Sequence, residues 1–188
     1  MKSTALSLLA CPLCGGELEL SAEGARCVTD DNIYPLRPSG LLDLRPPTIR
    51  GDADAFAADY RAARLREGWR PLSPEAALAL PEGAPAGFTR LYWQVRRESW
   101  AALRAFLPEL GADSLTIADA GAGFPWLSHR LARLGHQVVA FDLSDDADFG
   151  LGATALYDDI FLAVLGSLEA PPLTAAGYHA VVCNASLH

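Results

Sequence analysis

The stretch Ile117-Ala-Asp-Ala-Gly-Ala-Gly123 decides the fold of this chain, because a short apolar run passes directly into a turn that contains glycine. Apolar residues at helical spacing follow over residues 126–134, and a second apolar run, Gln137-Val-Val-Ala-Phe141, comes next and ends at Asp142. This order of strand, glycine turn, helix and strand is typical of a parallel α/β unit.

The pattern continues toward the C-terminus. Residues 158–164 are predicted to be helical, a weak third strand is predicted near residues 165–168, and Tyr178-His-Ala-Val-Val-Cys-Asn184 is a predicted fourth strand. Continuous apolar strands that alternate with helices predict a parallel sheet covered on both faces. Cys183 lies inside the fourth run, and we expect it to be a buried core thiol.

The glycine turn and the acid after the second strand indicate a ligand that contains adenosine. Without a Cβ, Gly121 and Gly123 let the chain turn tightly and bring backbone N–H groups close to a ligand. Asp142 can accept hydrogen bonds from both hydroxyls of a ribose. A dinucleotide-binding turn would have a third small residue where Trp126 stands, and Asp119 would repel a pyrophosphate. A cofactor with a positive amino group suits Asp119 better, which disfavours a nicotinamide-dependent reductase.

Two stretches carry a resemblance to a known family. Asp119-Ala-Gly-Ala-Gly-Phe-Pro-Trp-Leu-Ser128 and Val138-Val-Ala-Phe-Asp-Leu-Ser144 resemble the first two motifs of class I S-adenosylmethionine-dependent methyltransferases of the type 11 kind. The resemblance implies that Asp119, Gly121 and Gly123 surround the amino-acid part of S-adenosylmethionine and that Asp142 binds its ribose. Ala120, Ala122 and Leu143 are expected in the same site.

The resemblance is weaker further along the chain. Gly166-Ser-Leu-Glu-Ala-Pro-Pro-Leu173 is similar to the family's third-strand motif, but Ser167 stands where an aspartate usually contacts the adenine. That contact is therefore expected to be weaker or lost. Val181-Val-Cys-Asn-Ala-Ser-Leu-His188 is similar to the fourth-strand motif, near which sulfonium and substrate meet. The predicted cofactor site is completed by Ser167, Leu168, Glu169 and Asn184.

The family's sheet has seven strands in the order 3-2-1-4-5-7-6, and this sequence accounts for the part 3-2-1-4. We therefore expect residues 112–188 to form the N-terminal half of a Rossmann-like domain that binds S-adenosylmethionine. The resemblance implies either a truncated enzyme or a sheet that a partner chain completes. An open sheet edge at the fourth strand would favour self-association.

Residues 1–47 are predicted to form a small module that resembles a zinc ribbon. Cys11-Pro-Leu-Cys14-Gly-Gly has the spacing of a zinc knuckle, and Cys27 starts a second one. Asp30 takes the place of the expected fourth cysteine, and Asp31 follows it. Either carboxylate could complete a Cys3Asp zinc site, predicted as Cys11, Cys14, Cys27 and Asp30. The alternative is a ribbon that has lost its metal and folds on its apolar residues.

The segment Tyr34-Pro-Leu-Arg-Pro-Ser-Gly-Leu-Leu-Asp43 is similar to the tail of such ribbons, which precede the catalytic domain in some bacterial methyltransferases, including ribosomal RNA guanine methyltransferases. Residues 48–111 are predicted to form a helical linker, with one helix that ends at Gly68 and a short one that Ser73 starts. Two interpretations are open for four residues of this linker. They could fold over the cofactor and control access of the substrate, or they could be ordinary core aromatics and solvent-facing arginines: Tyr60, Arg64, Tyr92 and Arg96.

Charge and hydropathy exclude several classes of function. The chain of 188 residues has a net charge of −8, and residues 113–188 hold 2 basic and 9 acidic side chains. An acidic surface disfavours a nucleic-acid partner, and no apolar run is long enough to span a membrane. We expect a cytoplasmic protein. A lipoprotein signal ending at Cys11 is the alternative, but its apolar stretch is very short.

The sequence thus predicts a methyltransferase whose acceptor is unknown, with a small molecule favoured over RNA. Methyl transfer is an in-line displacement that needs placement and desolvation more than acid or base groups, so no catalytic residue is predicted. The alternative is a non-catalytic module that binds S-adenosylmethionine or S-adenosylhomocysteine, or recruits a partner.

Overall fold

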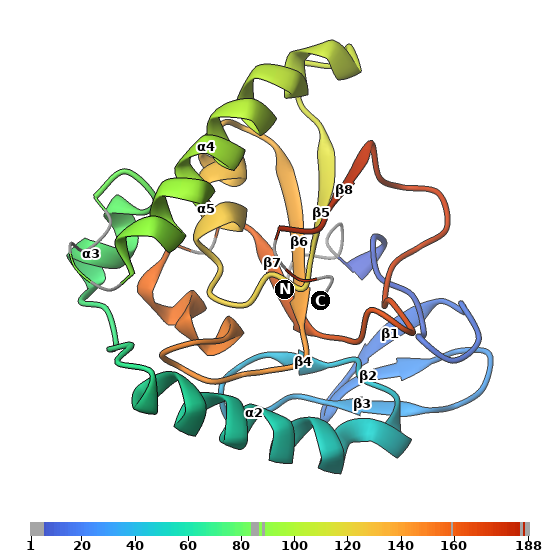
Figure 1. Ribbon diagram of the computed structural model, residues 1–188. Helices are drawn as coiled ribbons and strands as arrows, with labels where there is room; N and C mark the ends of the chain where they lie inside the picture. Colours follow the sequence, from blue (N-terminus) through green and yellow to red (C-terminus); the bar gives the residue numbers. More distant parts are fainter. Residues whose placement is uncertain (1–5, 84–86, 88, 159, 185, 187–188) are drawn as a thin grey trace.

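The computed structural model describes residues 6–83, 87, 89–158, 160–184 and 186 (Figure 1). Its larger sheet has five strands, all parallel, which confirms the expected α/β class. Across the sheet the strands are β4 (Leu42–Asp43), β7 (Leu162–Leu165), β6 (Gln137–Asp142), β5 (Thr116–Ala120) and β8 (Ala180–Val182).

Strand β4 is the addition that the sequence analysis did not foresee. It comes from the Cys-containing segment rather than from the glycine-turn unit, and Leu42 and Asp43 pair with Val164 and Leu165 of β7. Two residues are too few to show a period, so no pattern distinguishes this strand from a loop. Residues 1–47 therefore contribute a strand to the parallel sheet.

The rest of that segment forms a smaller antiparallel sheet in the order β1-β2-β3. Its strands are β1 (Leu18–Ser21), β2 (Gly24–Cys27) and β3 (Ile33–Pro35). Figure 1 shows this sheet, in blue, beside β4 at the lower right of the molecule.

The two faces of the parallel sheet are covered differently, as the alternation along β6 shows. Val138 faces a helical layer with two buried tryptophans of α4 (Arg90–Phe106) and the apolar side of α5 (Trp126–Arg133). Val139 and Phe141 face the opposite way and share one core with the Cys-containing segment. Successive strand residues point to opposite faces, so each layer takes every second side chain. The small module thus takes the place of a helical layer on one face.

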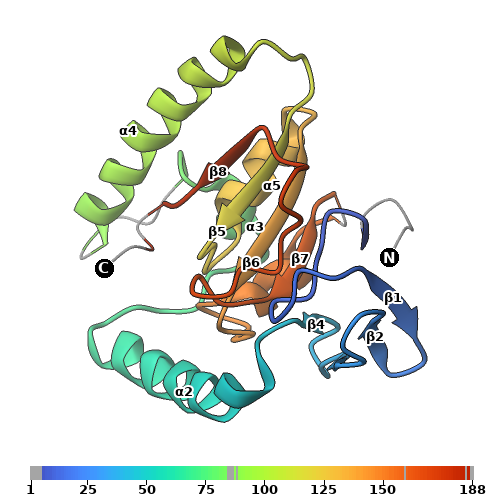
Figure 2. The same cartoon turned by 90° about the vertical axis from the view of Figure 1, so that its right-hand side faces the viewer.

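Two helices precede α4. Helix α2 (Arg50–Arg66) ends just before Gly68, which has a φ of 94° and turns the chain, as expected. Helix α3 (Pro74–Ala79) begins at Ser73, whose hydroxyl accepts a hydrogen bond from the N–H of Ala76 and so confirms the predicted cap. In Figure 2, α4 runs along one side of the sheet and α2 lies beyond the end at which β5 and β6 finish.

Short 3-10 turns join these elements: η1 (Pro47–Ile49), η2 (Leu107–Leu110) and η3 (Leu151–Leu156). The helix predicted over residues 158–164 is wrong, because β7 begins at Leu162 and the turn η3 precedes it. Val164 and Leu165 are fully buried between β4 and β6. A short apolar run fits a buried strand as well as a helix, and here pairing on both edges selects the strand.

Cys183 also differs from its prediction. It follows β8 and is exposed, because β8 ends at Val182 and only three of its residues pair with β5. Within the described ranges, no helix combines the length and the hydropathy that crossing a membrane requires.

A buried ion pair joins three parts of the fold. Arg45 and Asp43 are both fully buried, and the guanidinium donates to both carboxylate oxygens at 2.8 and 2.7 Å. The same guanidinium donates to the carbonyl of Leu143 at 2.9 Å and pairs with Asp54 of α2 at 2.9 Å. Strand β4, helix α2 and the segment after β6 therefore meet at one side chain.

Replacing Arg45 with alanine should lower the free energy of unfolding by about 3–5 kcal/mol, because Asp43 would remain buried without its two short guanidinium hydrogen bonds, and Arg37 and Arg50 lie farther away at 4.0 and 3.8 Å. Urea denaturation of the two proteins measures this difference. The control is Arg26→Ala, whose side chain is 49% exposed in its ion pairs, and it should cost less than about 1 kcal/mol. If both variants lost the same free energy of unfolding, the buried pair would not stabilise the fold more than an exposed ion pair does.

Candidate functional site

A cavity of about 1010 Å³ opens at the carboxyl ends of β5, β6 and β7 and extends to α2 and α4. Ligands of open α/β sheets bind at this end of the strands. Of the predicted cofactor residues, the cavity is lined by Asp119, Gly121, Ala122, Gly123, Asp142, Leu143, Ser167, Leu168, Glu169 and Asn184. Ala120 is the exception, because its side chain is buried in the core under the Cys-containing module.

The glycine turn has a geometry that the sequence analysis only partly foresaw. Gly121 and Gly123 have φ values of 68° and 53°, which side chains rarely allow. The N–H groups of Gly121 and Ala122 donate to the carbonyl of Phe141 at 2.9 and 3.1 Å. The N–H of Gly123 donates to Asp142 at 2.9 Å. These amides are therefore engaged within the protein, and the expectation that they face a ligand is corrected.

Asp142 stands at the end of β6 with its carboxylate held in place by the backbone. One oxygen accepts from Gly123, and the other accepts from the N–H of Ser144 at 3.0 Å. Burial raises the pKa of Asp142, while these backbone hydrogen bonds act in the opposite direction. Each carboxylate oxygen can accept a second hydrogen bond, so the group can still bind two hydroxyls.

Asp119 stands one strand away, at the end of β5, and is only 1% exposed. The hydroxyl of Ser128, on α5, donates to it at 2.6 Å. Burial and the nearby charge of Asp142 together raise its pKa to about 6, although the hydrogen bonds from Ser128 act in the opposite direction. The cavity thus has a buried and a half-buried carboxylate on adjacent strands and a local electrostatic preference for a cationic ligand group.

Ser186 packs against the glycine turn from the segment after β8. Its hydroxyl donates to the carbonyl of Ala120 at 2.9 Å, and a Cβ on Gly121 would overlap the Ser186 side chain. Gly121 is therefore required twice, for its backbone conformation and for this close approach. Gly123 has open space on the side where a Cβ would lie.

Trp126 occupies the place of the third small residue of a dinucleotide-binding turn. Its ring lies 6.0 Å from that of Trp93 in an edge-to-face arrangement, so α4 covers it. The four residues offered as gates, Tyr60, Arg64, Tyr92 and Arg96, all line the cavity. Phe56, Trp69 and Phe149 line it as well, and the sequence analysis missed them. Trp69 comes directly after Gly68, where helix α2 ends and the chain turns. An aromatic residue beside this turn is the feature of the sequence that could have indicated its place in the cavity.

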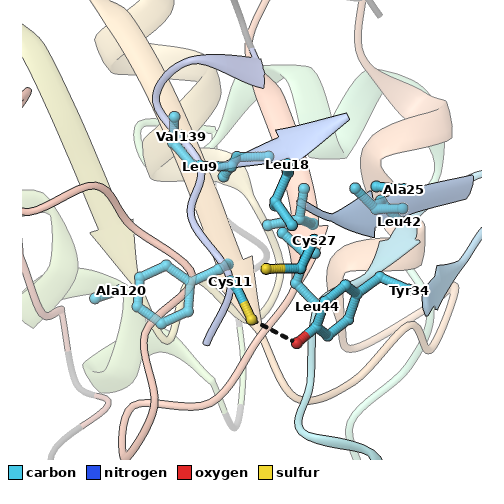
Figure 3. Packing of buried hydrophobic residues seen from close by; sticks show 12 residues of the cluster. Leu9, Cys11, Leu18, Ala25, Cys27, Tyr34, Leu42, Leu44, Ala120 and Val139 are labelled. Carbon is cyan, nitrogen blue, oxygen red and sulfur yellow. Dashed lines mark hydrogen bonds between the residues drawn. The ribbon is translucent and has the colours of Figure 1, made fainter. Parts of the chain in front are cut away.

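A second cluster lies in the Cys-containing module. Cys11, Cys14, Cys27 and Asp30 each offer a ligand atom, and these four atoms all lie within 4.8 Å of one another. The group could hold a metal ion. Figure 3 shows the sulfur atoms of Cys11 and Cys27 in the module's core, with the hydroxyl of Tyr34 at 3.0 Å from the sulfur of Cys11.

The local backbone supports this cluster. The N–H groups of Gly16 and Thr29 lie 3.4 Å from the sulfurs of Cys14 and Cys27, respectively. Such amides stabilise thiolates. Asp30 accepts from Cys11 at 3.3 Å, whereas Asp31 pairs with Arg26 at 2.7 Å. Asp30 is thus the carboxylate that joins the three cysteines.

No protein-family model matches the chain, and no curated protein matches it either. What the two sites do therefore has to be inferred from their residues and geometry.

Replacing Asp119 with asparagine should raise the free energy of unfolding by about 3 kcal/mol at about pH 8, because burying an ionised carboxylate is costly. The folded protein binds this proton more tightly than the unfolded chain, so the wild type gains stability as the pH falls through about 6. The advantage of the variant should therefore vanish below about pH 4. Urea denaturation across this range measures it.

The matched control is Asp113→Asn, which removes the same charge from an exposed position outside the cavity. The free energies of unfolding of Asp119→Asn and the wild type should differ by an amount that changes with pH. A difference that stays constant from acid to neutral pH would show that the fold does not shift the pKa of Asp119.

Proposed function

We propose that this chain binds S-adenosylmethionine and serves as the cofactor-binding part of a methyltransferase. The observation that carries the proposal is the pair of carboxylates, buried Asp119 and half-buried Asp142, at the ends of adjacent parallel strands in one cavity. The cofactor carries an ammonium group and a ribose, which match an anionic site and a hydrogen-bond acceptor.

The chemistry of the donor groups supports this cofactor over a dinucleotide. A pyrophosphate needs free backbone N–H groups, but those of Gly121, Ala122 and Gly123 are engaged by Phe141 and Asp142. Two carboxylates would also repel it. The residues that would hold S-adenosylmethionine are Asp119 at its amino group, Asp142 at its ribose, and Ser167 with Leu168 at the adenine side.

When bound, S-adenosylmethionine supplies a methyl group on a sulfonium, and the acceptor's electron pair forms the new bond as the carbon–sulfur bond breaks and its pair stays on sulfur. The residues of this chain contribute placement rather than proton transfer. Ser128 fixes the Asp119 carboxylate, and the backbone of Gly123 and Ser144 fixes that of Asp142. Aromatic side chains that line the cavity, among them Tyr92 and Trp126, would exclude water from the bound reactants.

Calorimetric titration with S-adenosylhomocysteine tests the proposal. The wild type should release or absorb heat with a one-to-one stoichiometry, and Asp142→Asn should weaken binding by about tenfold or more, because charge-assisted hydrogen bonds to the ribose are lost. Asp113→Asn is the control and should bind like the wild type. Absence of heat at about millimolar ligand would rule out the cofactor, since metabolic cofactors bind more tightly than that.

We further propose that Cys11, Cys14, Cys27 and Asp30 bind one zinc ion in a structural site. Three thiolates and one carboxylate make four ligands, the number that a closed tetrahedral zinc site uses. The amides of Gly16 and Thr29 provide the supporting hydrogen bonds to sulfur. Because the module shares a core with β6 and β7, zinc there would stabilise the whole domain.

The protein saturated with cobalt should show the intense visible bands of tetrahedral thiolate coordination, with one metal per chain. Asp30→Asn should lower metal affinity by about tenfold or more, whereas Asp31→Asn should leave it unchanged. Cys14→Ser should abolish the thiolate bands, and Cys183→Ser, which changes an exposed cysteine outside the cluster, should keep them. Equal effects of the two aspartate substitutions would contradict the assignment of the fourth ligand.

A further inference from the structure

The cavity contains charges of both signs, because guanidinium groups line it together with the two carboxylates. Arg64 comes from α2 and Arg96 comes from α4, and both line the same cavity as Asp119 and Asp142. Both guanidinium groups lie against one aromatic cluster. Arg64 is 5.0 Å from the ring centre of Trp69, and Trp69 meets Tyr92. Arg96 is 3.1 Å from the ring centre of Tyr92. S-adenosylmethionine has one carboxylate, whereas Arg64 and Arg96 bring two guanidinium groups to this cavity.

Arg64 is held in place by its neighbours. Its guanidinium donates to the hydroxyl of Tyr60 at 2.6 Å and pairs with Glu67 at 3.1 Å. The guanidinium carbon lies 4.6 Å from the ring centre of Tyr60 and 5.0 Å from that of Trp69. A cation over aromatic faces is attracted to them, and the planar group keeps donors free for a further acceptor.

Arg96 is the more informative of the two. Its guanidinium carbon lies 3.1 Å from the ring centre of Tyr92, and it donates to the carbonyl of Tyr92 at a long 3.4 Å. Within the described part of the chain, no carboxylate forms an ion pair with it. Burial lowers its pKa. A partly buried cation without an anion is costly, and an anionic ligand would remove that cost.

The rings around the arginines define the rest of the ligand. Trp69 and Tyr92 meet edge to face with ring centres 4.6 Å apart, and Tyr92 meets Trp93 at 5.5 Å. Flat apolar groups bind well against such rings. The pocket between the helices therefore offers an apolar surface beside a doubly positive one.

We propose that Arg64 and Arg96 form the acceptor subsite, and that the methyl acceptor is a small molecule with a flat apolar body and a carboxylate or phosphate group. This inference rests on the proposed function, since it places the anion in the same cavity as the carboxylates that would hold the cofactor. A nucleic acid fits less well, because its backbone needs a basic surface and this chain has a net charge of −8.

Fluorescence titration can test the subsite without turnover, because Trp69, Trp93 and Trp126 all line the cavity. The probes are benzoate, phenyl phosphate and the neutral benzamide, each added to the whole chain with and without S-adenosylhomocysteine. Benzoate or phenyl phosphate should bind about tenfold or more tightly than benzamide, and affinity should fall as salt is added. The tighter of the two anions identifies the acidic group of the acceptor.

Arg96→Gln should weaken anion binding by about tenfold or more and leave the affinity for S-adenosylhomocysteine within about twofold. Arg96→Lys keeps the charge and should retain part of the anion affinity, and thermal denaturation of each variant checks that it is folded. The matched control is Arg104→Gln, an exposed position on the same helix outside the cavity, which should bind like the wild type.

Three results would overturn the acceptor subsite: benzamide binding as tightly as the anions, anion binding unaffected by Arg96→Gln, or a loss of S-adenosylhomocysteine affinity in Arg96→Gln with unchanged anion binding. The last result would assign Arg96 to the cofactor's own carboxylate. If S-adenosylhomocysteine does not bind at all but anions still depend on Arg96, the proposed function fails while the anion site stands.

Discussion

The guanidinium of Arg45 lies in the interior with the carboxylate of Asp43, and both side chains are wholly removed from solvent. Such a pair is stable only when every donor and acceptor is satisfied. Here the remaining donors reach the carbonyl of Leu143 and the carboxylate of Asp54. The side chain therefore fixes where helix α2 lies relative to the end of β6. The cavity depends on it, because α2 forms one wall and Asp142 stands beside Leu143 on the other.

Around this anchor, exposed and half-buried ion pairs extend the same connection. Arg37 bridges Asp54 and Asp145, and Arg61 pairs with Asp146 and Asp148. Individually such pairs contribute little, but several in one network hold the loop after β6 against the helix. The acidic excess of the C-terminal third thus has a structural use, since part of it pairs with Arg37 of the Cys-containing segment and with Arg61 of the linker.

Function and stability oppose each other at Asp119. Its burial raises the pKa to about 6, so at neutral pH the fold carries an ionised carboxylate in an unfavourable environment. A cationic ligand would relieve the same cost, which links a local destabilisation to binding. Arg96 presents the complementary case in the same cavity, because no carboxylate among the described residues forms an ion pair with it. The lining of the cavity therefore includes carboxylates, guanidinium groups and aromatic rings.

The sequence by itself determined the parallel α/β class, the glycine turn, the end of α2, the start of α3, and most of the predicted cofactor residues that gather around the cavity. These features follow from local patterns, because hydrophobic period, glycine and helix caps act over a few residues. Only the tertiary structure decided that β4 joins the sheet, that residues 162–165 are a strand, and that the amides of the turn are engaged. It also selected Asp30 over Asp31 and brought Arg64 and Arg96 together. Each of these depends on contacts between residues distant in the chain, which no local pattern contains.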